Sequence, residues 1–340
     1  MSNDYTFIPS PETDSSLPKR SRFPVFPQIL ILGGFLILVF GIGIVTQQVN
    51  RSAPSSNPIS QQTAAINEAP DGLPDVIGPL QNIAITAESA FVLDVNTQRV
   101  LYSKNPDAVR PIASITKLMT TLVAHELVTE DTWVRIPQTA SALESTSGLI
   151  PGQLLTQQSL RDFAMMSSSN DAAHSIATAV GALLDSRQPL PSFVAAMNIR
   201  AAELGLSSMT FSNTTGLDTS ETQAGASASA RDVSFLMHYI LQNYPEILEP
   251  TRLADARIYT DTGAHYEAEN TNQQLASIPQ LLGSKTGYTT LAGGNLTIAF
   301  DAGYNRPVII TVLGSSYTGR FADAAVLIEA IQTSITNETQ

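Results

Sequence analysis

The sequence contains no charged residue between Arg22 and Arg51, and this stretch divides the chain. Its centre, residues 29–45, is an apolar run that only glycine interrupts. A helix over the uncharged stretch is long enough to cross the ~30 Å hydrocarbon core of a bilayer. We therefore expect a membrane-spanning helix here rather than a buried helix of a soluble domain.

Three basic residues, Lys19, Arg20 and Arg22, lie on the N-terminal side of the apolar run. Positive charge marks the cytoplasmic end of a membrane helix. Residues 1–22 are thus expected to form a cytoplasmic tail, and residues 23–46 an uncleaved transmembrane signal anchor. A cleaved signal peptide is the main alternative. Its apolar region is usually shorter, however, and no small-residue cleavage site directly follows this run.

The segment after the apolar run is rich in Gln, Ser, Pro, Asn and Ala and has almost no large apolar side chains. Such a segment cannot bury enough surface to offset its chain entropy. We expect residues 47–72 to be a flexible linker and residues 73–335 to be one folded domain. The chain is 43% hydrophobic, which leaves ample material for a core.

Composition excludes several classes of site. The chain has no cysteine, so disulfide scaffolds, thiolate catalysis and cysteine-ligated metals are absent. A net charge of −12 argues against a surface that binds nucleic acid. The four histidines are scattered and form no His-Glu-x-x-His pattern, and the Gly-x-Ser-x-Gly elbow is missing. We expect no metal and no cofactor, and we interpret each histidine as a structural or surface residue.

The folded domain begins and ends with strand-like segments around a helical middle. This order predicts an α+β fold whose terminal strands share one antiparallel sheet flanked by helices. The strand-like segments are residues 90–95, 99–102, 281–288, 295–302 and 307–313, and the helical ones are residues 115–127, 160–166, 171–180, 193–204, 229–241 and 321–331.

Ser114-Ile115-Thr116-Lys117 combines a hydroxyl and an amine three residues apart. Residues at this spacing share one face of a helix, so the Lys117 amine can lie beside the Ser114 hydroxyl. A serine is a poor nucleophile until a base removes its proton, and a desolvated lysine can act as that base. A capped helix with a solvent-facing lysine is the alternative interpretation.

Lys285-Thr286-Gly287 ends a second apolar run. A lysine beside a hydroxyl offers a cationic, hydrogen-bonding site for a carboxylate. A glycine on an edge strand lets another backbone approach closely. The tripeptide rarely occurs by chance. An ordinary strand end with a surface lysine is the alternative interpretation. A third candidate, Ser168-Ser169-Asn170, interrupts two predicted helices and by itself is typical of a loop.

The order Ser-x-x-Lys, Ser-x-Asn, Lys-Thr-Gly resembles the signature set of the penicillin-recognising serine acyltransferases. Longer segments look like the low-molecular-mass D-alanyl-D-alanine carboxypeptidases, penicillin-binding proteins of peptidase family S11. The resemblance covers residues 75–335. It implies the fold of serine β-lactamases and penicillin-binding transpeptidases, with a helical subdomain beside the sheet and the active site between them. The similar segments are residues 90–94, 100–102, 110–120, 168–173, 213–218, 229–232 and 285–293.

The resemblance also implies roles for individual residues. Ser114 would attack the bond between the last two D-alanines of a peptidoglycan stem peptide, with Lys117 as general base and Ser168 relaying a proton to the leaving nitrogen. The backbone N–H groups of Ser114 and Tyr288 would form the oxyanion hole. The substrate-binding residues would be Asn170, Lys285, Thr286, Gly287 and Arg320, the last helping to fix the substrate carboxylate.

The resemblance implies a serine-type carboxypeptidase, and the expected signal anchor places it in the bacterial cell membrane with its catalytic domain on the outer side. Peptidoglycan stem peptides would be its substrates and β-lactams its covalent inhibitors. Two positions depart from well-known members, because Ser169 stands where they carry glycine and Tyr288 where histidine is common. Two alternatives remain open: a D,D-endopeptidase that cleaves peptidoglycan cross-links, and a non-catalytic cell-wall-binding protein of the same fold.

Overall fold

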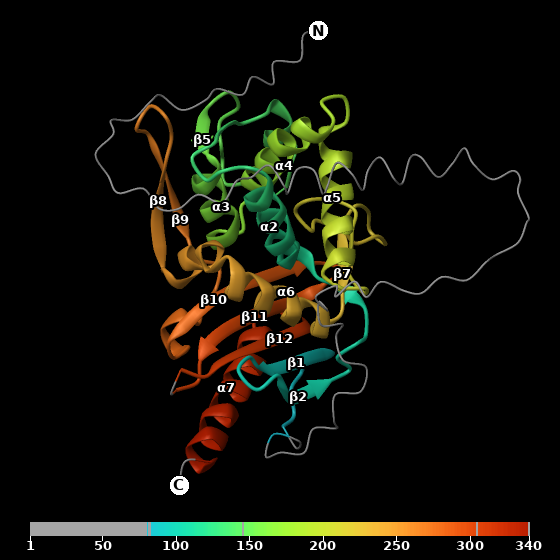
Figure 1. Ribbon diagram of the computed structural model, residues 1–340, viewed down its shortest axis with the longest axis vertical. Helices are drawn as coiled ribbons and strands as arrows, with labels where there is room; N and C mark the ends of the chain where they lie inside the picture. Colours follow the sequence, from blue (N-terminus) through green and yellow to red (C-terminus); the bar gives the residue numbers. More distant parts are fainter. Residues whose placement is uncertain (1–79, 81–82, 145, 304, 339–340) are drawn as a thin grey trace, which may run out of the picture. The chain divides into compact units, whose positions relative to one another are not determined.

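The computed structural model of the chain describes residues 80, 83–144, 146–303 and 305–338 (Figure 1). The predicted tail and signal anchor, and the predicted linker, lie outside these residues, as does the start of the predicted domain. Within the described residues, no helix combines the length and the apolar character that a bilayer crossing requires.

Five antiparallel strands form the main sheet, in the order β10-β11-β12-β1-β2. Strand β1 pairs with β12, with Phe91 opposite Thr311, so the first strand of the domain joins the last. The prediction that both ends of the domain share one antiparallel sheet is confirmed. The strands are β1 (Ser89–Asp94), β2 (Arg99–Lys104), β10 (Leu281–Thr289), β11 (Gly293–Asp301) and β12 (Pro307–Ser315).

Both faces of this sheet are buried, because side chains alternate between two cores along each strand. In β1, Phe91 and Leu93 belong to the larger core, whereas Ala90 and Val92 belong to the smaller one. Helix α6 (Ala230–Asn243) covers the first face and α7 (Gly319–Glu338) the second (Figure 1). Fully buried β-rich segments of this kind give continuous apolar runs.

The larger core continues from α6 into a helical region that lies beyond this face of the sheet (Figure 1). Its helices are α2 (Lys117–Leu127), α3 (Gln157–Met166), α4 (Asn170–Leu184) and α5 (Pro189–Glu203). A single turn of 3-10 helix, η1 (Ala113–Thr116), leads into α2, so the predicted helix 115–127 is divided.

Short elements complete the described chain. The hairpin of β8 (Asp255–Tyr259) and β9 (His265–Glu269) is one that the sequence pattern did not indicate. The other short elements are β3 (Arg110–Pro111), β4 (Trp133–Arg135), β5 (Leu154–Thr156), β6 (Thr210–Phe211), β7 (Ala226–Ala228), η2 (Gln138–Ala142), η3 (Pro245–Ile247), η4 (Glu249–Arg252) and η5 (Leu275–Ser277).

Candidate active site

Ser114 and Lys117 lie where η1 passes into α2. Lys117 is fully buried, and its Nζ donates a hydrogen bond of 2.8 Å to the half-buried Ser114 Oγ. The residue before the serine, Ala113, has a φ of +48°, which is unfavourable for a residue with a Cβ. The spacing predicted this serine–amine contact, and the structure brings the two groups together.

Two further oxygens hold the Lys117 amine. Its Nζ donates to Asn170 Oδ1 at 2.7 Å and to the Thr215 carbonyl at 3.0 Å. None of its three acceptors is a carboxylate. Burial, together with the charge of Lys285, holds the pKa of Lys117 well below its ordinary value, and Asp171 offsets this only in part. A lysine in this setting can lose its proton and accept the one on Ser114.

The Thr215 carbonyl is a site group that sequence reasoning missed. Residues 213–218 form a turn in which Asn213 Oδ1 accepts from the Gly216 nitrogen at 2.7 Å. Gly216 has a φ of +81°, and a Cβ there would lie 2.0 Å from the Ala113 carbonyl oxygen. Only glycine fits this position, so the turn presses against η1 and presents its carbonyl to Lys117. The segment was one of those that carried the resemblance, but a backbone oxygen has no side-chain signature.

Lys285 lies on β10 and faces the loop between α3 and α4. It is 1% exposed, and its Nζ donates to Ser168 Oγ at 2.9 Å and to the Thr286 carbonyl at 3.1 Å. Burial, and secondly the charge of Arg320, lowers the pKa of Lys285 to about 7. Ser168 has a φ of +59°, a strained conformation that costs roughly 1–3 kcal/mol and is typical of functional loops.

Gly287 allows β10 to meet η1. A Cβ there would lie 2.6 Å from the Ile112 carbonyl oxygen and 3.2 Å from the Ser114 nitrogen. The predicted close backbone approach is therefore present. It brings Tyr288, the next residue, beside the turn that carries Ser114. Thr286 on the same strand is buried, and its Oγ1 lies 2.6 Å from Thr271 Oγ1.

Arg320 lies in the first turn of the last helix, α7, and points back to β10. Its Nη1 donates to the Gly287 carbonyl at 2.7 Å, and its guanidinium lies 4.6 Å from the centre of the Tyr317 ring. Its Nε is buried without a hydrogen-bond partner. Among the described residues, neither Arg320 nor Lys285 forms an ion pair with a carboxylate. Because two buried cations lie here without a counter-ion among the described residues, this part of the site is suited to bind an anion.

The serine that replaces glycine in the second motif caps a helix. Ser169 Oγ accepts from the Ala172 nitrogen at the start of α4, and its hydroxyl also contacts Asp171. Asp171 in turn accepts from the backbone of Ser147 and Leu149. This departure leaves Ser168 and Asn170 in place and stabilises the helix that carries Asn170.

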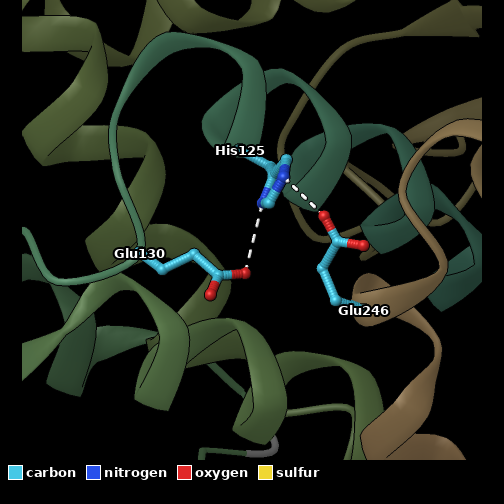
Figure 2. A group of neighbouring side chains, drawn as sticks. All are labelled: His125, Glu130 and Glu246. Atoms are coloured by element: carbon cyan, nitrogen blue, oxygen red, sulfur yellow. Dashed lines mark ion pairs between the residues drawn. The ribbon is translucent and has the colours of Figure 1, made fainter. Parts of the chain in front are cut away.

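Three side chains of the kinds that can bind a metal ion lie together outside this site, near the C-terminal end of α2 (Figure 2). His125 Nε2 is 3.0 Å from Glu246 and Nδ1 is 3.6 Å from Glu130, and one ligand atom from each residue lies within 4.8 Å of the others. Glu130 is also paired with Arg161. We interpret the group as an ion-pair network that fixes this end of α2, about 12 Å along the helix from Lys117.

Comparisons with known proteins point to one family. A family model described as the peptidase S11 D-alanyl-D-alanine carboxypeptidases matches residues 77–317. A D-alanyl-D-alanine endopeptidase of Escherichia coli is 32% identical over 73% of this chain and 78% of its own length. The D-alanyl-D-alanine carboxypeptidase DacF of Bacillus subtilis is 30% identical over 69% of this chain, which spans 59% of that protein.

Solved structures extend the likeness to the fold. The Streptomyces K15 DD-transpeptidase matches with a TM-score of 0.67 and 26% identity, over 74% of this chain and 98% of that one. Penicillin-binding protein D2 of Listeria monocytogenes, in its ampicillin-bound form, matches with a TM-score of 0.62 and 30% identity, over 74% of this chain and 98% of that one.

Proposed function

Because the chain belongs to the D-alanyl-D-alanine carboxypeptidase family of serine peptidases, we propose that it removes the terminal D-alanine from peptidoglycan stem peptides. Its fold is that of the penicillin-binding DD-transpeptidases, as the motifs implied. The observation that carries the proposal is the contact of a fully buried lysine amine, free of any carboxylate, with the Ser114 hydroxyl.

Acylation begins with a proton transfer from Ser114 Oγ to the neutral amine of Lys117. The oxygen then attacks the carbonyl carbon between the two D-alanines, and the charge that develops on the carbonyl oxygen is taken by the backbone N–H groups of Ser114 and Tyr288. Ser168, hydrogen-bonded to Lys285, relays the proton that Lys117 took from Ser114 to the leaving nitrogen as the C–N bond breaks, which returns the Lys117 amine to its neutral form. Water then cleaves the ester and restores Ser114.

Substrate recognition follows from the charge on the other side of the site. Lys285 and Arg320 are buried cations that lack a counter-ion among the described residues, and Thr286 adds a hydroxyl beside them. A terminal carboxylate bound here neutralises both cations and gives charge-assisted hydrogen bonds. Asn170 and Gly287 complete the binding site, Asn170 by bonding the substrate amide and Gly287 by letting the backbones approach. A β-lactam, which carries a carboxylate beside its reactive carbonyl, occupies the same place as a covalent inhibitor.

Cleavage of cross-links is the second candidate, and the relatives favour it specifically. Endopeptidases from Escherichia coli and Pseudomonas aeruginosa are each 32% identical to this chain. The same machinery serves either reaction, because each breaks an amide next to a D-alanine carbonyl. A non-catalytic descendant has no use for a nucleophile–base pair, and this chain retains one.

The membrane anchor belongs to the same proposal. Residues 23–46 hold the protein in the bacterial cell membrane, with residues 1–22 in the cytoplasm and the catalytic domain outside. Support comes from the uncharged apolar sequence and the basic residues before it. Retention of the full-length chain in washed membranes, with an intact N-terminus, is expected. A mature N-terminus near residues 50–60 would contradict the anchor.

Mass spectrometry of muropeptides tests the activity. The detergent-solubilised full chain is incubated separately with a pentapeptide muropeptide and with a cross-linked dimer. Loss of one D-alanine from the pentapeptide supports the carboxypeptidase, and splitting of the dimer supports the endopeptidase. If neither substrate changes while a Ser114→Ala variant behaves identically, the proposed hydrolase is wrong.

A further inference from the structure

Two half-exposed aromatic rings stand beside the proposed carboxylate site. Tyr288 is 51% exposed and Tyr317 is 47% exposed. Their ring centres are 5.1 Å apart with the planes at 89°, an edge-to-face arrangement that favours a rigid pair. Single exposed aromatic residues are common on protein surfaces, whereas adjoining ones form a larger apolar patch of the kind that marks interaction sites.

The backbone and Arg320 fix the place of this pair. Tyr288 directly follows Gly287, whose Cα packs against the turn that carries Ser114. Arg320 donates to the carbonyl of Gly287, the residue before Tyr288, and its guanidinium lies over the Tyr317 ring. The pair therefore adjoins the cations that lack a counter-ion. The contacts of Lys117 with Asn170 and Thr215 belong to the other side of the site.

The leaving group differs between the two candidate reactions at one position. Where the cross-linking residue is a diamino dicarboxylic acid, the carbon next to the leaving nitrogen bears a carboxylate in both reactions, and Lys285 and Arg320 would bind it. In a terminal D-alanine this carbon also bears a methyl group. In a cross-link it bears the aliphatic arm of a diamino acid, which continues to a second stem peptide. Only the longer group extends past the carboxylate site.

We propose that Tyr288 and Tyr317 form a leaving-group platform that packs against the aliphatic arm of a cross-linking diamino acid. The platform gives a cross-linked dimer a leaving-group contact that a terminal D-alanine lacks. This inference rests on the proposed function of the same site. It explains why both rings keep about half of their surface exposed, which the contact of Tyr317 with Arg320 does not require.

Steady-state kinetics on the two muropeptides tests the platform. For Tyr317→Ala and for the double variant with Tyr288→Ala, kcat/KM on the dimer is expected to fall about tenfold more than on the pentapeptide, mainly through KM. The loss of packing for about two methylene groups gives a change of this size. Tyr317→Phe keeps the ring and should retain the wild-type selectivity. Tyr259→Ala removes a tyrosine that is 52% exposed on β8 and should leave both rates unchanged.

Two outcomes contradict the platform. Equal losses on both substrates mean that Tyr317 acts only by holding Arg320, and unchanged selectivity means that the rings contact neither leaving group. Covalent labelling with a fluorescent penicillin identifies variants that have folded, and Tyr317→Leu, which removes the ring but keeps an apolar side chain, replaces Tyr317→Ala if that variant has not. Failure of the proposed function is seen separately, because the wild-type protein then converts neither muropeptide.

Discussion

The two sides of the site hold their buried lysines in different ways. On the helical side, Lys117 donates to three neutral oxygens that the protein itself supplies. On the sheet side, Lys285 has two such acceptors, stands near a second cation and meets no carboxylate in the part of the chain that the structure describes. Within that part, the Nε of the second cation, Arg320, is buried without a hydrogen-bond partner. The nucleophile side is thus complete before substrate arrives, whereas the sheet side is completed by an anion.

Replacing the proposed nucleophile, Ser114, should have the largest effect on the helical side of the site. Ser114→Ala should lower kcat by at least about 10⁴-fold and abolish penicillin acylation, because the residual machinery cannot form an ester. Muropeptide hydrolysis and covalent labelling measure both effects. Ser141→Ala, at an exposed serine of η2, is the control and should label normally. Labelling of the Ser114→Ala variant would remove the nucleophile assignment.

Loss of the proposed general base, Lys117, should have the second-largest effect on the reaction rate. Lys117→Ala should slow acylation on the order of 10³-fold, as expected when a general base is lost. The change also removes one hydrogen bond to Asn170 Oδ1 and one to the Thr215 carbonyl, so a drop in Tm is expected. Lys104→Ala is the matched control, since Lys104 binds the carbonyls of Ile85 and Ala87 away from the site. Near-normal acylation without Lys117 would exclude it as the base.

A substitution on the sheet side should change substrate binding and its dependence on pH, rather than remove a chemical step. Lys285 has a pKa of about 7 and must be charged to bind a carboxylate, so kcat/KM should fall as the pH rises above about 7. Lys285→Gln cannot titrate. Its kcat/KM should therefore be lower, by about 10²-fold through KM, and should lack this high-pH limb. A limb that survives in Lys285→Gln would assign the titration to another group.

The smallest effect is expected at a residue that only positions the base. Asn213→Ala removes the bond that closes the turn of residues 213–218 and loosens the Thr215 carbonyl from Lys117. We expect about a tenfold loss of kcat with KM little changed, and a lower Tm. If the low-pH limb of the kcat profile shifts relative to wild type, Lys117 has lost the Thr215 carbonyl as an acceptor. General loosening of the fold would not shift this limb. An unchanged pH profile with a reduced Tm alone would indicate a purely structural role.

The sequence allowed prediction of those parts of the site that are built from side chains at short spacing. Ser114 and Lys117 are three residues apart, and the Lys285 motif is rare enough to be found without a structure. Strand runs at both ends of the domain likewise predicted one sheet, because both faces of that sheet are buried and the runs are continuously apolar.

Other features depend on contacts that no local pattern encodes. The Thr215 carbonyl is a backbone atom, and it lies near Lys117 only because a glycine lets one turn press on another. Arg320 was carried over by resemblance, but its bond to the Gly287 carbonyl joins residues 33 positions apart. The pairing of Tyr288 with Tyr317 and the group around His125 depend in the same way on tertiary packing, which the sequence pattern does not specify.

Peptide mapping of the penicillin adduct tests the central assignment most directly. The full chain is labelled with a penicillin, digested and sequenced by mass spectrometry, with the Lys117→Ala variant treated in parallel. The expected result is one penicilloyl group on Ser114 in the wild-type protein, with formation of the adduct strongly slowed in the variant. An adduct on another residue, or equal labelling rates in both proteins, would contradict the pairing of Ser114 with Lys117.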